Sequence, residues 1–296
     1  MMRLYMIAMR LWAWLSTGVC LAAVLILLGF LLSRGAGVLN TQLLFGTVAP
    51  LDALTGRVPV WDGLWPALVG TLVLVLLAGA FAVPVGTGCG IYLAEYARGR
   101  TKRLIDGSVD LLAGVPSVLM GLFGFMAIVF VRRTVAPQAN TGLLVAAICL
   151  ALLVLPYLVS ATRAALEGLP ASLRLTCSSL GLTRWQSIAH VLLPAASRSI
   201  AGGVVLALGR AAEDTAVILL TGVVANAGLP RSLGDKFEAL PFAIYSIAAE
   251  HQTQAELERG FGAALLLLAL TSALLAGAQI LHRSLERKWA ISRWPG

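Results

Sequence analysis

Long uncharged apolar runs, separated by shorter polar intervals, make up most of this chain. A bilayer is crossed by roughly 20 apolar residues in a helix, and five runs have about that length. They are residues 11–33, 69–93, 111–131, 142–160 and 261–281. A sixth run, 199–224, is interrupted only by three charged residues. This pattern predicts an all-α polytopic membrane protein with six transmembrane helices.

The composition supports this fold class. Of 296 residues, 59% are hydrophobic and 12% are charged, whereas soluble domains are about half apolar and about a quarter charged. The net charge of +8 would suit a nucleic-acid partner, but the charges flank membrane runs instead of forming a basic domain. We therefore expect membrane lipid and no nucleic acid around the chain.

Lysine and arginine are distributed unequally between the two sides of the predicted membrane. With the N-terminus inside, 14 of them fall on the cytoplasmic side and 7 on the opposite side, and Arg210 lies within a span. Positive residues accumulate in cytoplasmic loops. Both termini and the interval 163–198 are thus predicted to be cytoplasmic.

The predicted layout has three parts: an N-terminal span with an outer loop (1–63), a core (64–287) and a cytoplasmic tail (288–296). Residues 98–103 form a basic loop after the second span. We expect Glu95, Asp106 and Asp110 to pair with it. An amphipathic segment at 240–250 is predicted on the outer side, as a lid, a docking surface or an interfacial helix.

A polar interval with helical spacing lies at 173–194, between two spans. Gly181 interrupts the spacing, and Pro194 is expected to stop the helical stretch after that interruption. The pattern predicts a short helix, a bend and a second helix at the membrane surface, although a plain connector is an equally good interpretation. The expected polar face is Thr176, Ser179 and Thr183, and the expected apolar anchors are Leu175, Leu182 and Trp185.

Three charges inside the fifth span are the sharpest chemical anomaly. Arg210 is followed by Glu213 and Asp214 at i+3 and i+4, so all three can share one helix face. A charge at the bilayer centre costs roughly 2.5–3.5 kcal/mol and therefore usually faces a partner or a watery path. Either the three neutralise one another structurally, or Arg210 meets an anionic solute by bidentate hydrogen bonds. Thr215 belongs to the same candidate solute path.

Nothing in the chain predicts catalysis or a bound cofactor. His190, His251 and His282 are scattered, and no Walker phosphate loop is present. The chain is therefore predicted to be no enzyme and to need no metal or cofactor. If transport consumes ATP, another chain must hydrolyse it.

Several motifs resemble those of a known family, the membrane-spanning permeases of bacterial ABC importers. Gly181, Leu193 and Pro194 match the family's cytoplasmic coupling loop, with Val191 in place of Ile and Leu175-Thr176-Cys177 in place of Glu-Ala-Ala. Other segments resemble the PstA-type branch of phosphate importers, with Asp214 on the branch's Glu and Glu213 in place of a Gly. These segments are 70–86, 91–97, 110–118, 121–124, 206–211, 215–216 and 219–222.

The resemblance covers roughly residues 64–287 and implies a type I importer permease in the bacterial inner (plasma) membrane. It implies three partners: a PstC-type permease in a heterodimer, a pair of ATPase subunits under the coupling loop, and a periplasmic or lipid-anchored phosphate-binding protein above. The expected function is translocation of inorganic phosphate by alternating access.

Three other hypotheses stay open. The solute could be another oxyanion: molybdate, tungstate, sulfate or phosphonate. Glu213 and Asp214 could carry protons in a secondary transporter, which would have no use for a coupling loop. In a non-transporting subunit, the Arg210 cluster would only hold helices together.

Overall fold

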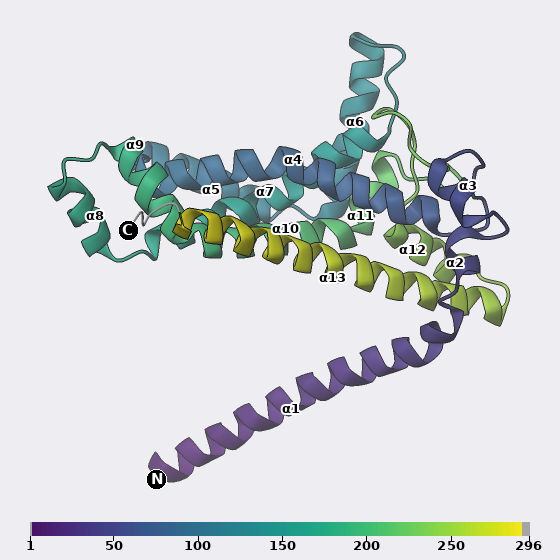
Figure 1. Ribbon diagram of the computed structural model, residues 1–296, viewed down its shortest axis with the longest axis horizontal. Helices are drawn as coiled ribbons and strands as arrows, with labels where there is room; N and C mark the ends of the chain where they lie inside the picture. Colours follow the sequence, from purple (N-terminus) through teal and green to yellow (C-terminus); the bar gives the residue numbers. More distant parts are fainter. Residues whose placement is uncertain (1, 292–296) are drawn as a thin grey trace.

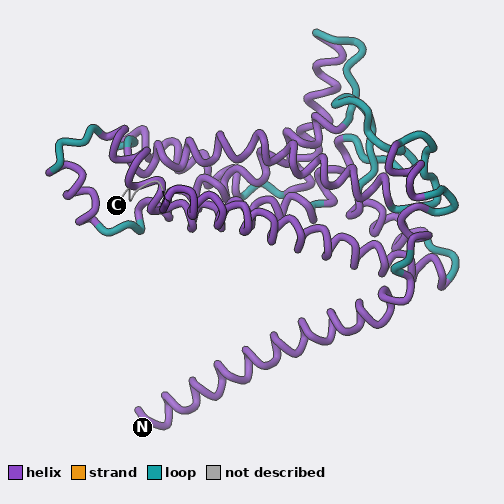
Figure 2. Tube along the Cα trace, viewed as in Figure 1, coloured by secondary structure: helices purple, strands orange, loops and turns teal. Residues whose placement is uncertain are grey.

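The computed structural model describes residues 2–291, and helices dominate it (Figures 1 and 2). Six of them are long and apolar enough to cross a membrane, which confirms the predicted all-α architecture. They are α1 (Met2–Gly35), α4 (Trp65–Glu95), α6 (Ser117–Thr134), α7 (Leu143–Glu167), α10 (Leu193–Glu213) with the turns before it, and α13 (Gln254–Ile291). Of the predicted tail 288–296, the first four residues extend α13, and residues 292–296 lie outside the described part.

Helices α4, α7 and α10 form the centre of the bundle because small residues let their backbones approach closely. A Cβ atom on Gly86 would lie 2.6 Å from Leu158 Cβ, and one on Gly79 would lie 2.7 Å from Leu208 Cδ2. Such contacts leave no room for a side chain, which is how glycine supports tight helix packing in membranes. Leu150 and Leu158, both fully buried in α7, fill the space between these helices.

Helix α1 leaves the bundle at an angle (Figure 1). It meets the rest of the chain mainly near its C-terminal end, where the Phe30 and Phe261 rings lie 5.6 Å apart. Along its length large side chains such as Trp12 remain exposed. An apolar helix that its own chain leaves bare must be covered by lipid or by another subunit in a membrane.

The predicted start of the third span, 111–131, is wrong. Helix α5 (Gly99–Ala113) contains most of the predicted basic loop, and α6 begins only at Ser117. Pro116 is the N-cap residue of α6, and the residue before a proline is disfavoured in helical conformation. The charge-free run therefore contains the end of α5 and most of α6 and is not one helix. Helix α6 points away from the long axis of the bundle (Figure 1).

The end of the bundle opposite the N-terminus holds the short helices α2 (Thr41–Phe45), α3 (Pro50–Thr55) and α12 (Leu240–Glu250). The loop before α12 covers the start of α7, because Leu143 N donates to Asp235 O (3.0 Å) and Leu144 N to Leu233 O (2.8 Å). Helix α12 is fastened to α4 by Leu240 N donating to Thr71 Oγ1 (2.8 Å). The N-terminus and α8 (Ala171–Ser179) lie at the other end (Figure 1).

Candidate functional site

The fifth span is broken where its sequence carries two acids. Helix α10 ends at Glu213, Asp214 adopts φ −76° and ψ 112°, and α11 (Thr215–Thr221) then begins. The Asp214 carboxylate accepts a hydrogen bond from Val217 N (2.9 Å) and is therefore the N-cap of α11. Asp214 has thus left the helix on which Arg210 and Glu213 lie, and the three do not share one helix face as predicted.

Arg210 lies in the last turn of α10, and its side chain is exposed. Its guanidinium carbon lies 4.8 Å from the centre of the Tyr157 ring of α7. Among the residues whose side chains the structure describes, none forms a hydrogen bond or ion pair with this guanidinium, so neither Glu213 nor Asp214 neutralises it. Thr215, the first residue of α11, is half-buried, and Glu213 is exposed.

One face of α10 is uncovered from its predicted cytoplasmic end to the break. The opposite face packs against α4 and α7 through buried alanines such as Ala207 and Ala211. An arginine on an uncovered face of a span would be costly against lipid. This face therefore requires a second subunit or water beside it. The exposed residues along this face are Ala195, Ser199, Gly202, Leu206, Arg210 and Glu213.

The cap formed by Asp214 gives a prediction that separates its structural role from its charge. We expect Asp214→Ala to destabilise the folded protein by about 1 kcal/mol, because the start of α11 loses its side-chain acceptor. Asp214→Asn should keep the cap and the stability while removing the charge. Thermal unfolding of the detergent-solubilised protein measures both. Equal unfolding temperatures for Ala and wild type would contradict the capping role.

The predicted coupling loop has the expected shape, a short helix, a bend and a second helix. Gly181 follows α8 with φ +71°. Its N–H donates to Ser178 O (3.0 Å), and Leu182 N donates to Cys177 O (3.1 Å). These two bonds form a Schellman motif, the glycine-dependent way to end a helix. Helix α9 (Arg184–Ser187) then starts with a capping box between Thr183 and Gln186.

Two expectations about this loop are wrong. Thr183 lies in the bend and caps α9, so it does not share a helix face with Thr176 and Ser179. Pro194 does not stop the helix but lies in the first turn of α10. A π-helical stretch, η2 (Ile188–Leu192), precedes it. Its wider turn makes room for a proline ring that a regular α-helix interior would exclude.

The predicted coupling residues divide into an exposed and a buried group. Leu175 and Trp185 are each 67% exposed, and the neighbouring Leu180 is 72% exposed. Thr176 is also exposed, whereas Cys177 is buried against its own chain, and Val191, Leu193 and Pro194 are half-buried. The three bare apolar side chains are therefore free to meet another protein, while Cys177, Val191, Leu193 and Pro194 hold the loop to the core.

An ion pair that the sequence did not predict ties α8 to the bundle. Arg174 Nη2 donates to Glu95 Oε1 at the end of α4 (2.7 Å) and to Leu166 O (2.8 Å). The predicted partners of Glu95 and Asp106 were therefore wrong, since Asp106 pairs with Arg163 of α7. The partners Arg174 and Glu95 are 79 residues apart, so local spacing carries no signal for this contact.

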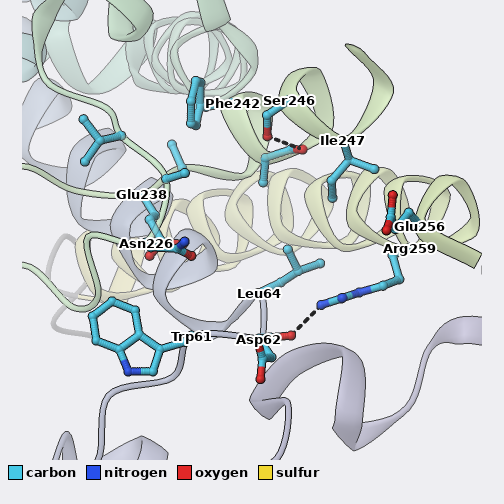
Figure 3. A pocket seen from close by; sticks show the side chains of 15 residues that line it. Trp61, Asp62, Leu64, Asn226, Glu238, Phe242, Ser246, Ile247, Glu256 and Arg259 are labelled. Atoms are coloured by element: carbon cyan, nitrogen blue, oxygen red, sulfur yellow. Dashed lines mark hydrogen bonds between the residues drawn. The ribbon is translucent and has the colours of Figure 1, made fainter. Parts of the chain in front are cut away.

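A pocket of about 200 Å³ opens at the end of the bundle that is predicted to face outward (Figure 3). It lies between the segment that precedes α4 (61–64), the loop before α12, and helices α12 and α13, so α12 lines a cavity instead of lying alone on the surface. Burial raises the pKa of the Glu238 carboxyl in its wall, partly offset by backbone N–H donors of Gly228 and Ala227. Arg259 donates to Asp62 O across its floor.

Among the side chains that the structure describes, no group of three or more His, Cys, Asp or Glu residues could hold a metal ion.

The family profile "Binding-protein-dependent transport system inner membrane component" matches residues 86–291. Phosphate transport system permease protein PstA 1 of Mycobacterium tuberculosis (strain CDC 1551 / Oshkosh) is 34% identical over 228 residues, which cover 76% of this chain and 73% of the relative. Phosphate transport system permease protein PstC of Pasteurella multocida (strain Pm70) is 29% identical over 245 residues, covering 75% of both chains.

Solved structures with the same fold are also transporters. A bacterial ABC transporter involved in the import of alginate superposes with a TM-score of 0.62 at 17% identity, over 93% of this chain and 99% of that one. The MetNI methionine ABC transporter in an inward-facing conformation gives 0.60 at 18% identity, over 80% of this chain and 99% of that one.

Proposed function

Because this chain belongs to the family of binding-protein-dependent transport system inner membrane components, we propose that it is a permease subunit that moves inorganic phosphate across the bacterial inner membrane in an ATP-driven importer. The observation that carries the proposal is Arg210, a cation at the break of a span with no ion pair in the described residues. The phosphate transport permeases among its relatives support the same solute.

The chemistry of the break suits a protonated oxyanion. A guanidinium offers several N–H donors in a rigid plane, which matches two oxygens of phosphate. At neutral pH phosphate still carries a proton, and the Glu213 carboxylate three residues away can accept it in a hydrogen bond. Sulfate carries no such proton and would be repelled by the same carboxylate. Arg210 and Glu213 together therefore favour phosphate over sulfate, while Asp214 holds α11 in place.

The coupling loop supplies the mechanical part of the proposal. ATP binding to a separate ATPase pair would move the bare side chains Leu175, Leu180 and Trp185. The bond from Arg174 to Glu95 joins this loop to the end of α4, so the motion reaches the central bundle as a rigid-body shift. Alternating access then results from rocking of the spans. This chain itself hydrolyses nothing.

The uncovered surfaces indicate where partners would bind. The bare α1 and the open face of α10 suit a second permease of PstC type, with this chain as the PstA-type member of a heterodimer. The exposed apolar residues of the coupling loop suit an ATPase subunit. The outward end with its pocket suits an external phosphate-binding protein, either periplasmic or lipid-anchored.

Uptake of radiolabelled phosphate tests the proposal. The chain is co-produced with its second permease, ATPase and binding protein in bacteria that lack other phosphate uptake. We expect uptake that disappears when the ATPase carries a hydrolysis-blocking substitution, and that excess sulfate or molybdate does not inhibit. Uptake that survives the ATPase defect but collapses with a protonophore would favour a secondary transporter. Uptake of sulfate or molybdate alone would reassign the solute.

A further inference from the structure

In the part of the chain that the structure describes, the guanidinium of Arg210 lies against an aromatic ring and pairs with no acid. The guanidinium carbon is 4.8 Å from the centre of the Tyr157 ring, well within the roughly 6 Å over which a cation is attracted to an aromatic face. Its N–H groups donate to no acceptor in the described part of the chain. The side chain is thereby held without using its hydrogen-bond donors.

Tyr157 is well placed to fix a long and flexible neighbour. It follows Pro156 in α7, and the next residue, Leu158, is only 1% exposed and packs beneath α10. Helices α7 and α10 touch so closely that a Cβ atom on Gly203 would overlap the Ala161 side chain. The ring itself is 39% exposed, so it faces the same open side as Arg210.

We propose that Tyr157 is a positioning residue for Arg210, and that its ring holds the guanidinium with the N–H donors directed at a tetrahedral oxyanion. The inference rests on the proposed function and extends it. A carboxylate in place of the ring would occupy the same donors and would compete with the solute. A neutral ring attracts the cation and leaves the donors vacant, which allows phosphate to bind briefly and to leave.

The kinetics of phosphate uptake by the complete importer test this role. We expect Tyr157→Leu to raise KM for phosphate about tenfold, equivalent to about 1.4 kcal/mol, while maximal uptake per assembled complex changes little. Tyr157→Phe keeps the ring and should restore KM to within about twofold. The matched control is Tyr92→Leu, since Tyr92 of α4 is similarly exposed (42%) but stacks on Tyr96. An unchanged KM in Tyr157→Leu would overturn the proposal. A KM in Tyr157→Phe as high as in Tyr157→Leu would also do so, because the hydroxyl would then be the working group.

A double-mutant cycle tests whether Tyr157 and Arg210 interact, whatever the solute is. Tyr157→Leu, Arg210→Gln and the double variant are compared by thermal unfolding of the purified complex. If the ring holds the cation, the two shifts in unfolding temperature are not additive, and strict additivity would overturn the proposal. A wild-type importer that moves no phosphate would refute the proposed solute, yet the cycle would still report whether Tyr157 holds Arg210.

Discussion

Arg210→Gln is expected to abolish phosphate uptake while the importer still assembles. The substitution removes the charge at the break of the fifth span and leaves a shorter, neutral polar side chain. A hydrogen bond to a charged group contributes about 1.5–3 kcal/mol, and each 1.4 kcal/mol corresponds to a tenfold change. Loss of a bidentate contact should therefore reduce uptake by at least about 100-fold. Uptake per complex, normalised to the amount purified with the ATPase, is the measurement.

Two further variants make this result specific. Arg210→Lys keeps the charge but not the planar fork, so its uptake should lie between those of wild type and Arg210→Gln. Arg198→Gln removes an exposed arginine three turns earlier in α10 and should leave uptake near wild type. Because Arg210 has no ion pair with any side chain that the structure describes, its loss should not impair assembly. Wild-type uptake by Arg210→Gln would refute the site, and failed assembly would favour a structural role.

The spans were predictable because burial in a bilayer leaves a long, uninterrupted apolar signal. The same signal failed at α5 and α6, since it reports polarity and not backbone conformation. Residues 111–131 are uniformly apolar, but Pro116 divides them between two helices with different directions. The cluster of charges at residues 98–103 likewise predicted a loop, whereas residues 99–103 form the first turns of the amphipathic helix α5.

The candidate site was predictable only in part. Arg210 and the acids after it are visible in the sequence because charges inside a span are rare. Their arrangement is not, because Asp214 uses its carboxylate on a backbone N–H and leaves Arg210 to Tyr157, 53 residues earlier. The ion pair between Arg174 and Glu95 could not be predicted either, because its partners lie far apart in the sequence. Such contacts depend on which helices pack together, which one chain's pattern does not reveal.

The bend at Gly181 should be as sensitive as the charge at Arg210, although nothing lies within 4 Å of a Cβ atom placed there. Its φ of +71° costs an ordinary L-residue about 1–2 kcal/mol, and a β-branched residue is a stronger outlier. Gly181→Val should therefore disrupt the Schellman motif and move Leu175 and Leu180 relative to Trp185. We expect phosphate uptake to fall at least tenfold, through weaker ATPase binding in pull-down or through ATP hydrolysis without transport.

Two controls test whether the loss of uptake in Gly181→Val comes from the backbone conformation at this position and not from the added side-chain bulk. Gly181→Asn adds a side chain of comparable size, but asparagine tolerates left-handed backbone, so uptake should be largely retained. Gly107→Val adds the same bulk at an open, helical position of α5 and should leave coupling intact. If Gly181→Val instead kept normal ATPase binding and normal coupling, the segment would be a plain connector. The motion of the ATPase would then have to reach the bundle by another route. The ion pair between Arg174 and Glu95 could transmit that motion only if the ATPase first moved the bend at Gly181.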